Sequence, residues 1–512
     1  MITRSSGILL HISSLPGREG IGSMGNDAFA FVDFLHETRQ QLWQILPLGP
    51  TGMGNSPYQS YSAFAGNLLY IGLDKLVEDG LLPEEELHKI PEFLPRKVDY
   101  DEVYKIKNIF LKKAYVVFKE RFDDWKEAYY SFLGKNSWWL DDYALYRAIK
   151  DSDDSLSWND WNLPLKKRVS HHLDVAIHKY SEELNFHRFV QFIFFRQWFN
   201  LKAYANKKGI RIIGDLPLYV AFDSSDVWTN QDLFMLDGEG RMEIVGGVPP
   251  DYFSETGQYW GCPVYNWARL EERGYDWWIA RIHFNLYLFD MIRIDHFRGL
   301  ESFWGIPEEE ENAVNGKWFP AKGRELLSVL KSQLGNLPVI AEDLGIITPE
   351  VEKLRTDFGF PGMKVLQFAY GSDEKNDNLP HNYRLDSVVY TGTHDNDTTI
   401  GWLKSATRTE QKNLRKYYDS GWGHLHRKLI EAAWASVAAM AIIPMQDLLE
   451  LDSRGRMNTP GTEADNWNWR FEWRMLKKQQ LKFLRKLTKK YNRYNRKGKK
   501  DLSAEGRKET DE

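Results

Sequence analysis

Eight short apolar segments, each ending in polar residues, are spread along the 512-residue chain. Each is rich in β-branched or other apolar side chains and is bounded by turn-forming residues, which is typical of buried parallel strands. They are residues 7–11, 41–47, 210–215, 290–295, 338–342, 363–368, 387–391 and 437–446. Helix-like stretches such as 350–358 and 408–419 separate most of them. Eight such units predict an α/β fold, a (β/α)8 barrel, whose active site is built from residues at the strand ends.

Two intervals between these strands are too long to be simple connections. Residues about 72–190 are rich in Glu, Lys, Trp and Leu and predict a mainly helical insertion. Residues about 220–275 are rich in Gly, Pro, Asp and aromatic residues and predict a loop-rich insertion. We therefore expect residues 1–476 to form one catalytic barrel with two inserted subdomains. Residues 477–512 are expected to be a basic tail whose amphipathic helix either lies in solvent or binds an anion or polymer.

Aromatic residues make up 14% of the chain, and 20 of them are Trp. A single Trp is more often a core residue, but the excess favours a carbohydrate ligand, because aromatic faces pack on the C–H faces of sugar rings. The chain outside the tail is acidic, which argues against a nucleic-acid partner. No stretch approaches the roughly 20 apolar residues that span a membrane, and Cys262 is the only cysteine. We expect a cytoplasmic enzyme, and the composition leaves its oligomeric state open.

Three acidic residues each follow a predicted strand. Asp295 comes two positions after Arg293, so both side chains share one face, and the guanidinium should lower the pKa of this carboxyl, which suits a nucleophile. Glu342 ends another strand, where crowding by other acids should raise its pKa, as a general acid requires. Asp395 follows a third strand. Each acid alone could be a helix N-cap or a surface residue, but three of them on one barrel favour a catalytic site.

The neighbours of these acids are hydrogen-bonding groups rather than a metal-binding motif. His296 follows Asp295 directly and His394 precedes Asp395, so each imidazole could hold a sugar hydroxyl. Residues 395–397 read DND, but they lack the spacing and the glycine of an EF-hand loop. The sequence contains no HExxH, no GxxxxGK[ST] and no usable GxGxxG. We therefore expect neither a metal nor a cofactor.

Longer motifs around these acids resemble those of a known family. The runs RIDHFRG (293–299), AEDLG (341–345) and THDN (393–396) are similar to motifs of the α-amylase clan. More specific runs are GPTGMGNSPYQSYSAFAGN (49–67), GDLPLYVAFDSSDVW (214–228), GVPPDYFSETGQYWG (247–261), GFPGMKVLQF (359–368) and RMNTPGTEADNWNWR (456–470). These resemble the 4-α-glucanotransferases of glycoside hydrolase family 77, the amylomaltases or disproportionating enzymes. The resemblance runs from about residue 6 to 474 and implies a barrel with inserted subdomains and without the C-terminal β-domain of amylases.

The resemblance also implies roles for individual residues. It implies that Asp295 is the nucleophile, Glu342 the acid/base and Asp395 a third carboxylate that binds sugar hydroxyls and stabilises the transition state. It implies substrate contacts at Tyr58, Asp215, Asp251, Trp260, Arg293, His296, His394 and Asn466. Residues 247–257 match a flexible loop that covers the acceptor side. The chain differs from the usual family pattern at Cys262, where Asn is usual, and at Leu68, where Pro is usual.

Together these features predict an enzyme that cuts an α-1,4-glucan and transfers the glycosyl part to the 4-hydroxyl of glucose or another glucan. The expected mechanism is a retaining double displacement through a covalent glycosyl-enzyme. An α-amylase-type hydrolase would use the same carboxylates with water as the acceptor. A glucan-binding protein on an inactive barrel is a further alternative, against which the intact acids argue. Product formation separates the enzymes from the binding protein, and product length separates the transferase from the hydrolase.

Overall fold

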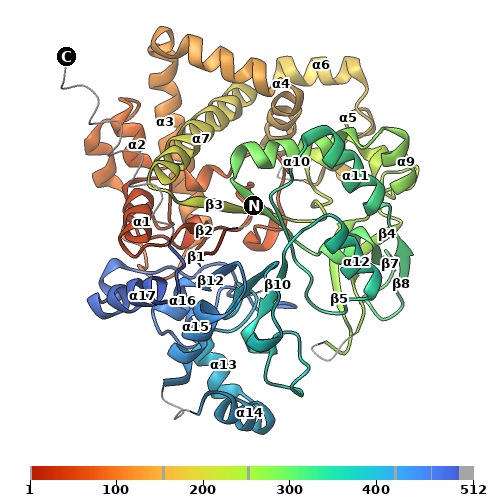
Figure 1. The fold of residues 1–512 in the computed structure, drawn as a ribbon. Helices are drawn as coiled ribbons and strands as arrows, with labels where there is room; N and C mark the ends of the chain where they lie inside the picture. Colours follow the sequence, from red (N-terminus) through yellow and green to blue (C-terminus); the bar gives the residue numbers. More distant parts are fainter. Residues whose placement is uncertain (1–2, 153–155, 251–253, 420–423, 463, 495–512) are drawn as a thin grey trace, which may run out of the picture.

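The computed structural model describes residues 3–152, 156–250, 254–419, 424–462 and 464–494. Eight parallel strands in these residues form a closed barrel surrounded by helices (Figure 1). In order around the barrel they are β1 (Ser5–Leu9), β2 (Leu42–Gln44), β3 (Arg211–Leu216), β6 (Met291–Ile294), β9 (Val339–Ala341), β10 (Gly362–Val365), β11 (Ser387–Tyr390) and β12 (Met440–Pro444). Each overlaps one of the eight predicted segments, so the (β/α)8 fold is confirmed.

The strands supply a continuous apolar core, and the helices that follow them cover it. Strand residues such as Ile8, Ile292 and Ile442 are fully buried, as parallel strands covered on both faces require. The helix α14 begins with a reciprocal capping pair, in which Thr407 and Glu410 each accept a hydrogen bond from the other's backbone N–H. The helices outside the insertion between β2 and β3 are α1 (Asn26–Glu37), α8 (Ser225–Thr229), α9 (Trp267–Glu272), α10 (Asp276–Leu288), α11 (Gly323–Leu334), α12 (Pro349–Asp357), α13 (Thr399–Ser405), α14 (Arg408–Tyr418), α15 (Leu425–Ala435), α16 (Met445–Leu448) and α17 (Lys478–Lys490).

The chain between β2 and β3 forms helices that lie together on one side of the barrel (Figure 1). They are α2 (Leu73–Glu78), α3 (Tyr100–Glu120), α4 (Phe122–Ser152), α5 (Leu163–Lys166), α6 (Ser170–Lys179) and α7 (Ser181–Lys207). Asp99 caps α3 by accepting a hydrogen bond from the backbone N–H of Glu102. The helix α7 leads directly into β3 and buries Phe189, Phe192 and Phe195 against its neighbours. The insertion is thus anchored on the barrel by an aromatic core.

A second sheet lies beside the barrel where the sequence predicts mainly loops. Its antiparallel order is β5 (Gln258–Pro263), β4 (Ile244–Val248), β7 (Ser302–Pro307) and β8 (Lys317–Pro320). Two of these strands, β4 and β5, lie inside the interval 220–275, which the sequence predicts to be loop-rich. The strands are short, and the pairing of β4 with β5 is irregular between Gly246 and Gly247. Local periodicity is weak in such strands, and β4 finds its second partner about 60 residues further along the chain.

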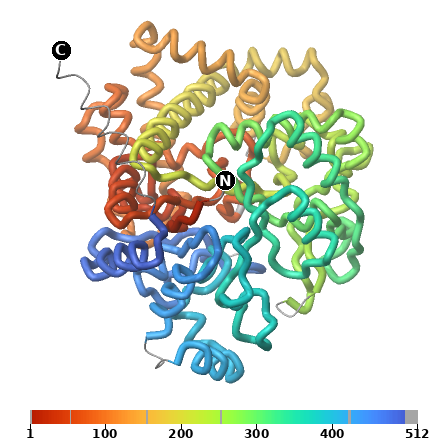
Figure 2. Tube along the Cα trace, in the orientation of Figure 1, coloured from red at the N-terminus to blue at the C-terminus, as the bar shows by residue number. Residues whose placement is uncertain are grey.

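The C-terminal helix α17 packs on the barrel instead of lying in solvent. Figure 2 shows it beside the N-terminal segment of the chain. Leu484 and Leu487 are buried, and Arg485 Nη2 donates a 2.9 Å hydrogen bond to Glu37 Oε1. Arg493 is fully buried, and its guanidinium donates to backbone carbonyls near the start of β1 and β12. The folded unit therefore continues past the expected boundary at residue 477, because the apolar stripe of α17 has a partner surface.

The last part of the expected tail, residues 495–512, lies outside the described residues. Among the helices of the described residues, none is both long and apolar enough to cross a membrane.

Candidate active site

The C-terminal ends of β3 and β6 place an arginine between two carboxylates. Strand pairing sets Asp215 directly opposite Arg293. Arg293 Nε lies 3.0 Å from Asp215 Oδ1, and Arg293 Nη2 lies 2.9 Å from Asp215 Oδ2. The same Nη2 lies 2.7 Å from Asp295 Oδ1. Arg293 and Asp215 are buried, whereas the side chain of Asp295 remains 31% exposed. One cation therefore orients both carboxylates and leaves Asp295 open to a ligand.

Glu342 lies just beyond the end of the adjacent strand β9. Its Oε2 accepts a 2.7 Å hydrogen bond from the backbone N–H of His296, and its Oε1 accepts a 3.0 Å bond from that of Leu344. His296 has a φ of 51°, which is uncommon for a residue with a side chain and often marks a functional turn. Burial raises the pKa of Glu342 to about 7. The direction agrees with the sequence prediction, although burial is the main cause rather than neighbouring acids.

The pKa of Asp295 is raised, contrary to the sequence prediction. Removal of the carboxyl group from bulk water in the barrel mouth is the main cause, and the charges of Asp215, Glu342 and Asp395 add to it. Arg293 opposes the shift, but Asp215 shares its single charge. The hydrogen-bond partners of the two acids nevertheless differ in charge. Asp295 has a cation at 2.7 Å, whereas Glu342 accepts only from neutral N–H groups. The ion pair with Arg293 therefore favours the ionised form of Asp295 more than that of Glu342.

Tyr58 connects the loop after β2 to the acids on the other side of the barrel mouth. Its hydroxyl donates a 2.8 Å hydrogen bond to Asp215 Oδ2 and accepts a 3.2 Å bond from Arg293 Nη2. The hydroxyl also lies 2.9 Å from His394 Nε2, and the two rings are stacked with their centroids 5.3 Å apart. His394 Nε2 lies 3.2 Å from Asp395 Oδ2. Burial lowers the pKa of His394, so a neutral imidazole completes this network.

Trp260 and His296 form one wall beside Asp295. Their rings meet edge to face at 4.8 Å. Burial lowers the pKa of His296 to about 4, and its buried Nε2 has no hydrogen-bond partner among the described residues. An unsatisfied buried polar atom is uncommon in a folded protein and often marks a functional site. Behind this wall, Gln59 Nε2 donates to the carbonyl of Trp260 at 3.0 Å and to Cys262 Sγ at 3.2 Å. The unusual Cys262 thus still supports Trp260 through Gln59.

One predicted contact, Asn466, does not join this cluster in the described residues. Asn466 uses its side chain within its own loop, where Oδ1 accepts a 2.9 Å bond from the backbone N–H of Thr459. Its Nδ2 donates a 2.8 Å bond to the carbonyl of Thr462. The amide braces the loop in this structure, and a direct sugar contact of Asn466 stays a prediction. Asp251 lies outside the described residues.

Sequence reasoning missed three residues that support Asp395 and the neighbouring Tyr58–His394 stack. Asn458 Nδ2 donates a 2.6 Å hydrogen bond to Asp395 Oδ1, and Arg456 Nη2 donates a 2.7 Å bond to the backbone carbonyl of Asp395. Trp467 packs against both rings of the Tyr58–His394 stack. All three lie in the run 456–470 that carries the family resemblance. That run signalled an important loop but did not show which of its side chains face the site.

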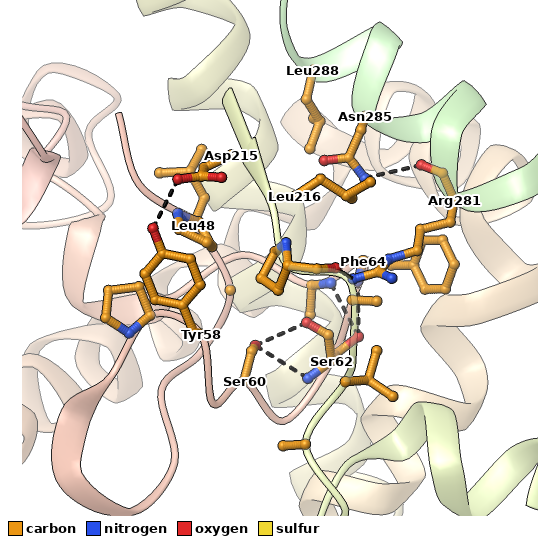
Figure 3. A pocket seen from close by; sticks show the side chains of 18 of the residues that line it. Leu48, Tyr58, Ser60, Ser62, Phe64, Asp215, Leu216, Arg281, Asn285 and Leu288 are labelled. Atoms are coloured by element: carbon orange, nitrogen blue, oxygen red, sulfur yellow. Dashed lines mark hydrogen bonds between the residues drawn. The ribbon is translucent and has the colours of Figure 1, made fainter. Parts of the chain in front are cut away.

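A cavity of about 50 Å³ lies directly behind the cluster (Figure 3). Tyr58 and Asp215 line one end of it, and Phe64, Arg281 and Asn285 line the other. Figure 3 shows the Tyr58–Asp215 hydrogen bond at the edge of the cavity. The volume is enough for a few water molecules but not for a sugar ring. The cluster also has an open side, on which the carboxyl group of Asp295 is partly exposed.

The described residues contain no group of three or more His, Cys, Asp or Glu side chains arranged to hold a metal ion. The barrel instead gathers acidic groups at the C-terminal ends of its strands, one of them with a pKa near 7. This arrangement defines the class of the protein as a (β/α)8 enzyme of the kind that acts on glycosidic bonds with carboxyl groups.

Comparison with known proteins gives the family. A family profile described as 4-alpha-glucanotransferase, glycoside hydrolase family 77, matches residues 10–477. The chain belongs to this 4-alpha-glucanotransferase family. It is 50% identical to the 4-alpha-glucanotransferase of Synechocystis sp., over 91% of this chain and 94% of that protein. It is 49% identical to the 4-alpha-glucanotransferase of Thermus thermophilus, over 92% of this chain and 95% of that protein.

A solved structure supports the same assignment. The amylomaltase from Streptococcus agalactiae in complex with acarbose superposes with a TM-score of 0.94 at 40% identity. The alignment covers 96% of this chain and 100% of that one. The two structures therefore share one fold over nearly the full length of both chains.

Proposed function

We propose that this 4-alpha-glucanotransferase transfers a segment of an α-1,4-glucan to the 4-hydroxyl of glucose or another glucan by a retaining double displacement. The observation that carries the mechanism is the pair formed by Asp295, half-buried and ion-paired with Arg293, and Glu342, half-buried without a cation partner and with a pKa raised to about 7. A retaining enzyme needs one carboxylate as a nucleophile and one carboxylic acid as a proton donor. The complex of the Streptococcus agalactiae amylomaltase with acarbose supports an oligosaccharide as the ligand.

In the first step, Glu342 donates its proton to the glycosidic oxygen of the leaving glucan. Asp295 attacks the anomeric carbon, and a covalent glycosyl-enzyme forms with inverted configuration. Glu342 is now ionised and accepts the proton of the acceptor's 4-hydroxyl in the second step. The second inversion restores the α-configuration, and Glu342 regains its proton.

The network around the two acids has a separate role in holding the sugar that is cleaved. Asp395, fixed by Asn458, can accept hydrogen bonds from sugar hydroxyls with its exposed carboxylate. His394 and Tyr58 are held close to it by their mutual stack. A preorganised set of groups costs little reorganisation when positive charge develops on the sugar ring. We assign Asp395 to transition-state stabilisation on this basis.

Transfer requires that an acceptor sugar outcompete water. Effective molarities of well-oriented groups reach roughly 10⁵ M or more, which exceeds the concentration of bulk water. The wall formed by Trp260 and the loop 247–257 are proposed to orient the acceptor and to exclude water. A hydrolase of the α-amylase type would lack this preference, and it remains the second candidate because it uses the same carboxylates.

Incubation with pure maltotriose tests the proposed function. We expect glucose and a ladder of glucans longer than maltotriose, while the total number of reducing ends stays nearly constant, because each transfer breaks one bond and makes one. Chromatography and a reducing-end assay measure both quantities. A steady rise in reducing ends without longer products would show that the enzyme is a hydrolase.

The pH dependence should follow the protonation of Glu342. The acid form of Glu342 is needed for the first step, and its pKa is raised to about 7, so kcat/KM for maltotriose should fall as the pH rises above about 7. With an α-glycosyl fluoride donor, which needs little protonation, this fall should be much weaker in the same buffers. An equal fall for both donors would contradict the assignment of Glu342 as the proton donor.

A cytoplasmic location stays a prediction. The relative from Solanum tuberosum, 46% identical over 91% of this chain, is named as chloroplastic/amyloplastic, so the family is not confined to one compartment.

A further inference from the structure

The second sheet carries a row of aromatic side chains across its strands. Tyr259 on β5 and Trp304 on β7 are both paired with Gly247 of β4, and Trp304 is paired with Trp318 on β8. Side chains at paired positions of neighbouring strands lie on the same face of a sheet. Since strands lie about 4.8 Å apart, the row spans about 14 Å, which is longer than one sugar ring. Figure 1 shows these strands together on one side of the barrel.

Trp318 is the exposed and firmly held end of this row. Its side chain is 37% exposed, although large apolar side chains usually gain by burial. The guanidinium of Arg298 lies over its ring at 3.7 Å, and Trp304 meets it edge to face at 5.2 Å. Trp304 is fixed in turn by a 2.9 Å hydrogen bond from its Nε1 to the carbonyl of Ala313. The exposed part of Trp318 is therefore a preorganised surface and not a side chain free to move.

Arg298 connects Trp318 to the two turns that carry the catalytic acids. Arg298 follows Asp295 by three residues, and its Nη1 donates a hydrogen bond to the carbonyl of Ile346, four residues after Glu342. Ile346 is itself 51% exposed. Arg298 is buried, and within the described part of the chain its Nε has no hydrogen-bond partner. The exposed apolar surface of Trp318 and Ile346 thus lies next to the side of the site where Glu342 acts, and the buried Arg298 holds its shape.

We infer that Trp318 and its neighbours Arg298 and Ile346 bind the distal glucose units of the acceptor glucan. This inference rests on the proposed function. Glu342 protonates the leaving oxygen and later activates the acceptor, so the leaving and accepting chains both occupy the Glu342 side of the cleaved bond. A neutral chain of sugar rings fits this surface, because the apolar C–H faces of the rings pack on aromatic side chains such as Trp318. The surface selects longer acceptors, since an acceptor glucose alone fills only the position beside Glu342, next to the glycosyl group that Asp295 carries.

A Trp318→Ala variant tests this inference when acceptors of different length are compared. Transfer from an α-maltosyl fluoride donor to labelled glucose, maltotriose and maltoheptaose should be measured for each protein. We expect the ratio of kcat/KM for maltoheptaose to kcat/KM for glucose to fall about 2- to 10-fold, the range typical of one aromatic contact, through a higher KM for the long acceptor. Trp318→Phe, which keeps an aromatic face, should recover most of the ratio.

Trp138 provides a matched control, because it is a half-exposed tryptophan on α4 that contacts Phe64 and Phe284. Trp138→Ala should leave the ratio at its wild-type value. An unchanged ratio in a folded Trp318→Ala protein, judged by its melting temperature, would overturn the inference. So would an equal loss with every acceptor, which would mean that Trp318 only supports the turns behind the acids. A wild-type enzyme that makes no transfer products would instead refute the proposed function.

Discussion

An Asp295→Asn variant should fold normally and lose turnover of α-1,4-glucans by on the order of 10⁴-fold or more. The amide has no charge with which to attack the anomeric carbon, so no glycosyl-enzyme forms. The fold should tolerate the change, because Arg293 keeps its two contacts with Asp215 and the side chain at position 295 is partly exposed. Production of glucose from maltotriose measures the loss, and the melting temperature checks the fold.

Asp357 offers a matched control for this substitution. Its side chain is 33% exposed and is also ion-paired with an arginine, but it lies at the end of α12 on the outside of the barrel. Asp357→Asn should keep wild-type turnover within about a factor of two. Activity near the wild-type level in a folded Asp295→Asn protein would remove Asp295 from the role of nucleophile.

A Glu342→Gln variant should lose transfer from maltotriose by about 10²- to 10⁴-fold, the usual contribution of a general acid. Its first step should be largely spared with an α-glycosyl fluoride donor, because fluoride leaves with little protonation. The second step still needs a base, so the glycosyl group should accumulate on Asp295. Mass spectrometry of the intact protein and of its peptides would detect the added sugar and its position.

The exposed Glu352 on α12 gives the corresponding control, since Glu352→Gln makes the same chemical change outside the site. This protein should show wild-type rates with both donors. If the Glu342→Gln variant loses the fluoride donor as severely as it loses maltotriose, then Glu342 has another task. Its carboxylate accepts hydrogen bonds from the backbone N–H groups of His296 and Leu344, so support of these two turns would be the first alternative role to test.

Several tertiary features had no local signal that could predict them. The partner of β4 lies about 60 residues away in β7, and short strands with glycines show little alternation. The amphipathic pattern of α17 was visible, but the surface that buries Leu484 and Leu487 is made by other helices. The pKa of Asp295 is raised mainly by its burial in the barrel mouth and further by the charge of Asp215, which reaches it through a contact between strands 78 residues apart. Each of these features depends on pairs of residues that are distant in the chain.

The sequence by itself determined the barrel, its eight strands and the acids at their ends. A buried parallel strand leaves a local mark, an apolar run followed by polar residues, and the closed barrel then brings all the strand ends to one mouth. Only the tertiary structure decided how the groups at that mouth share charge and protons: Arg293 between Asp215 and Asp295, Asn458 on Asp395, and two backbone N–H groups on Glu342. The physical reason is that hydrogen bonds and pKa shifts depend on distances of a few ångströms and on the exclusion of water. Those quantities arise when distant segments pack together, and no single segment of the chain contains them.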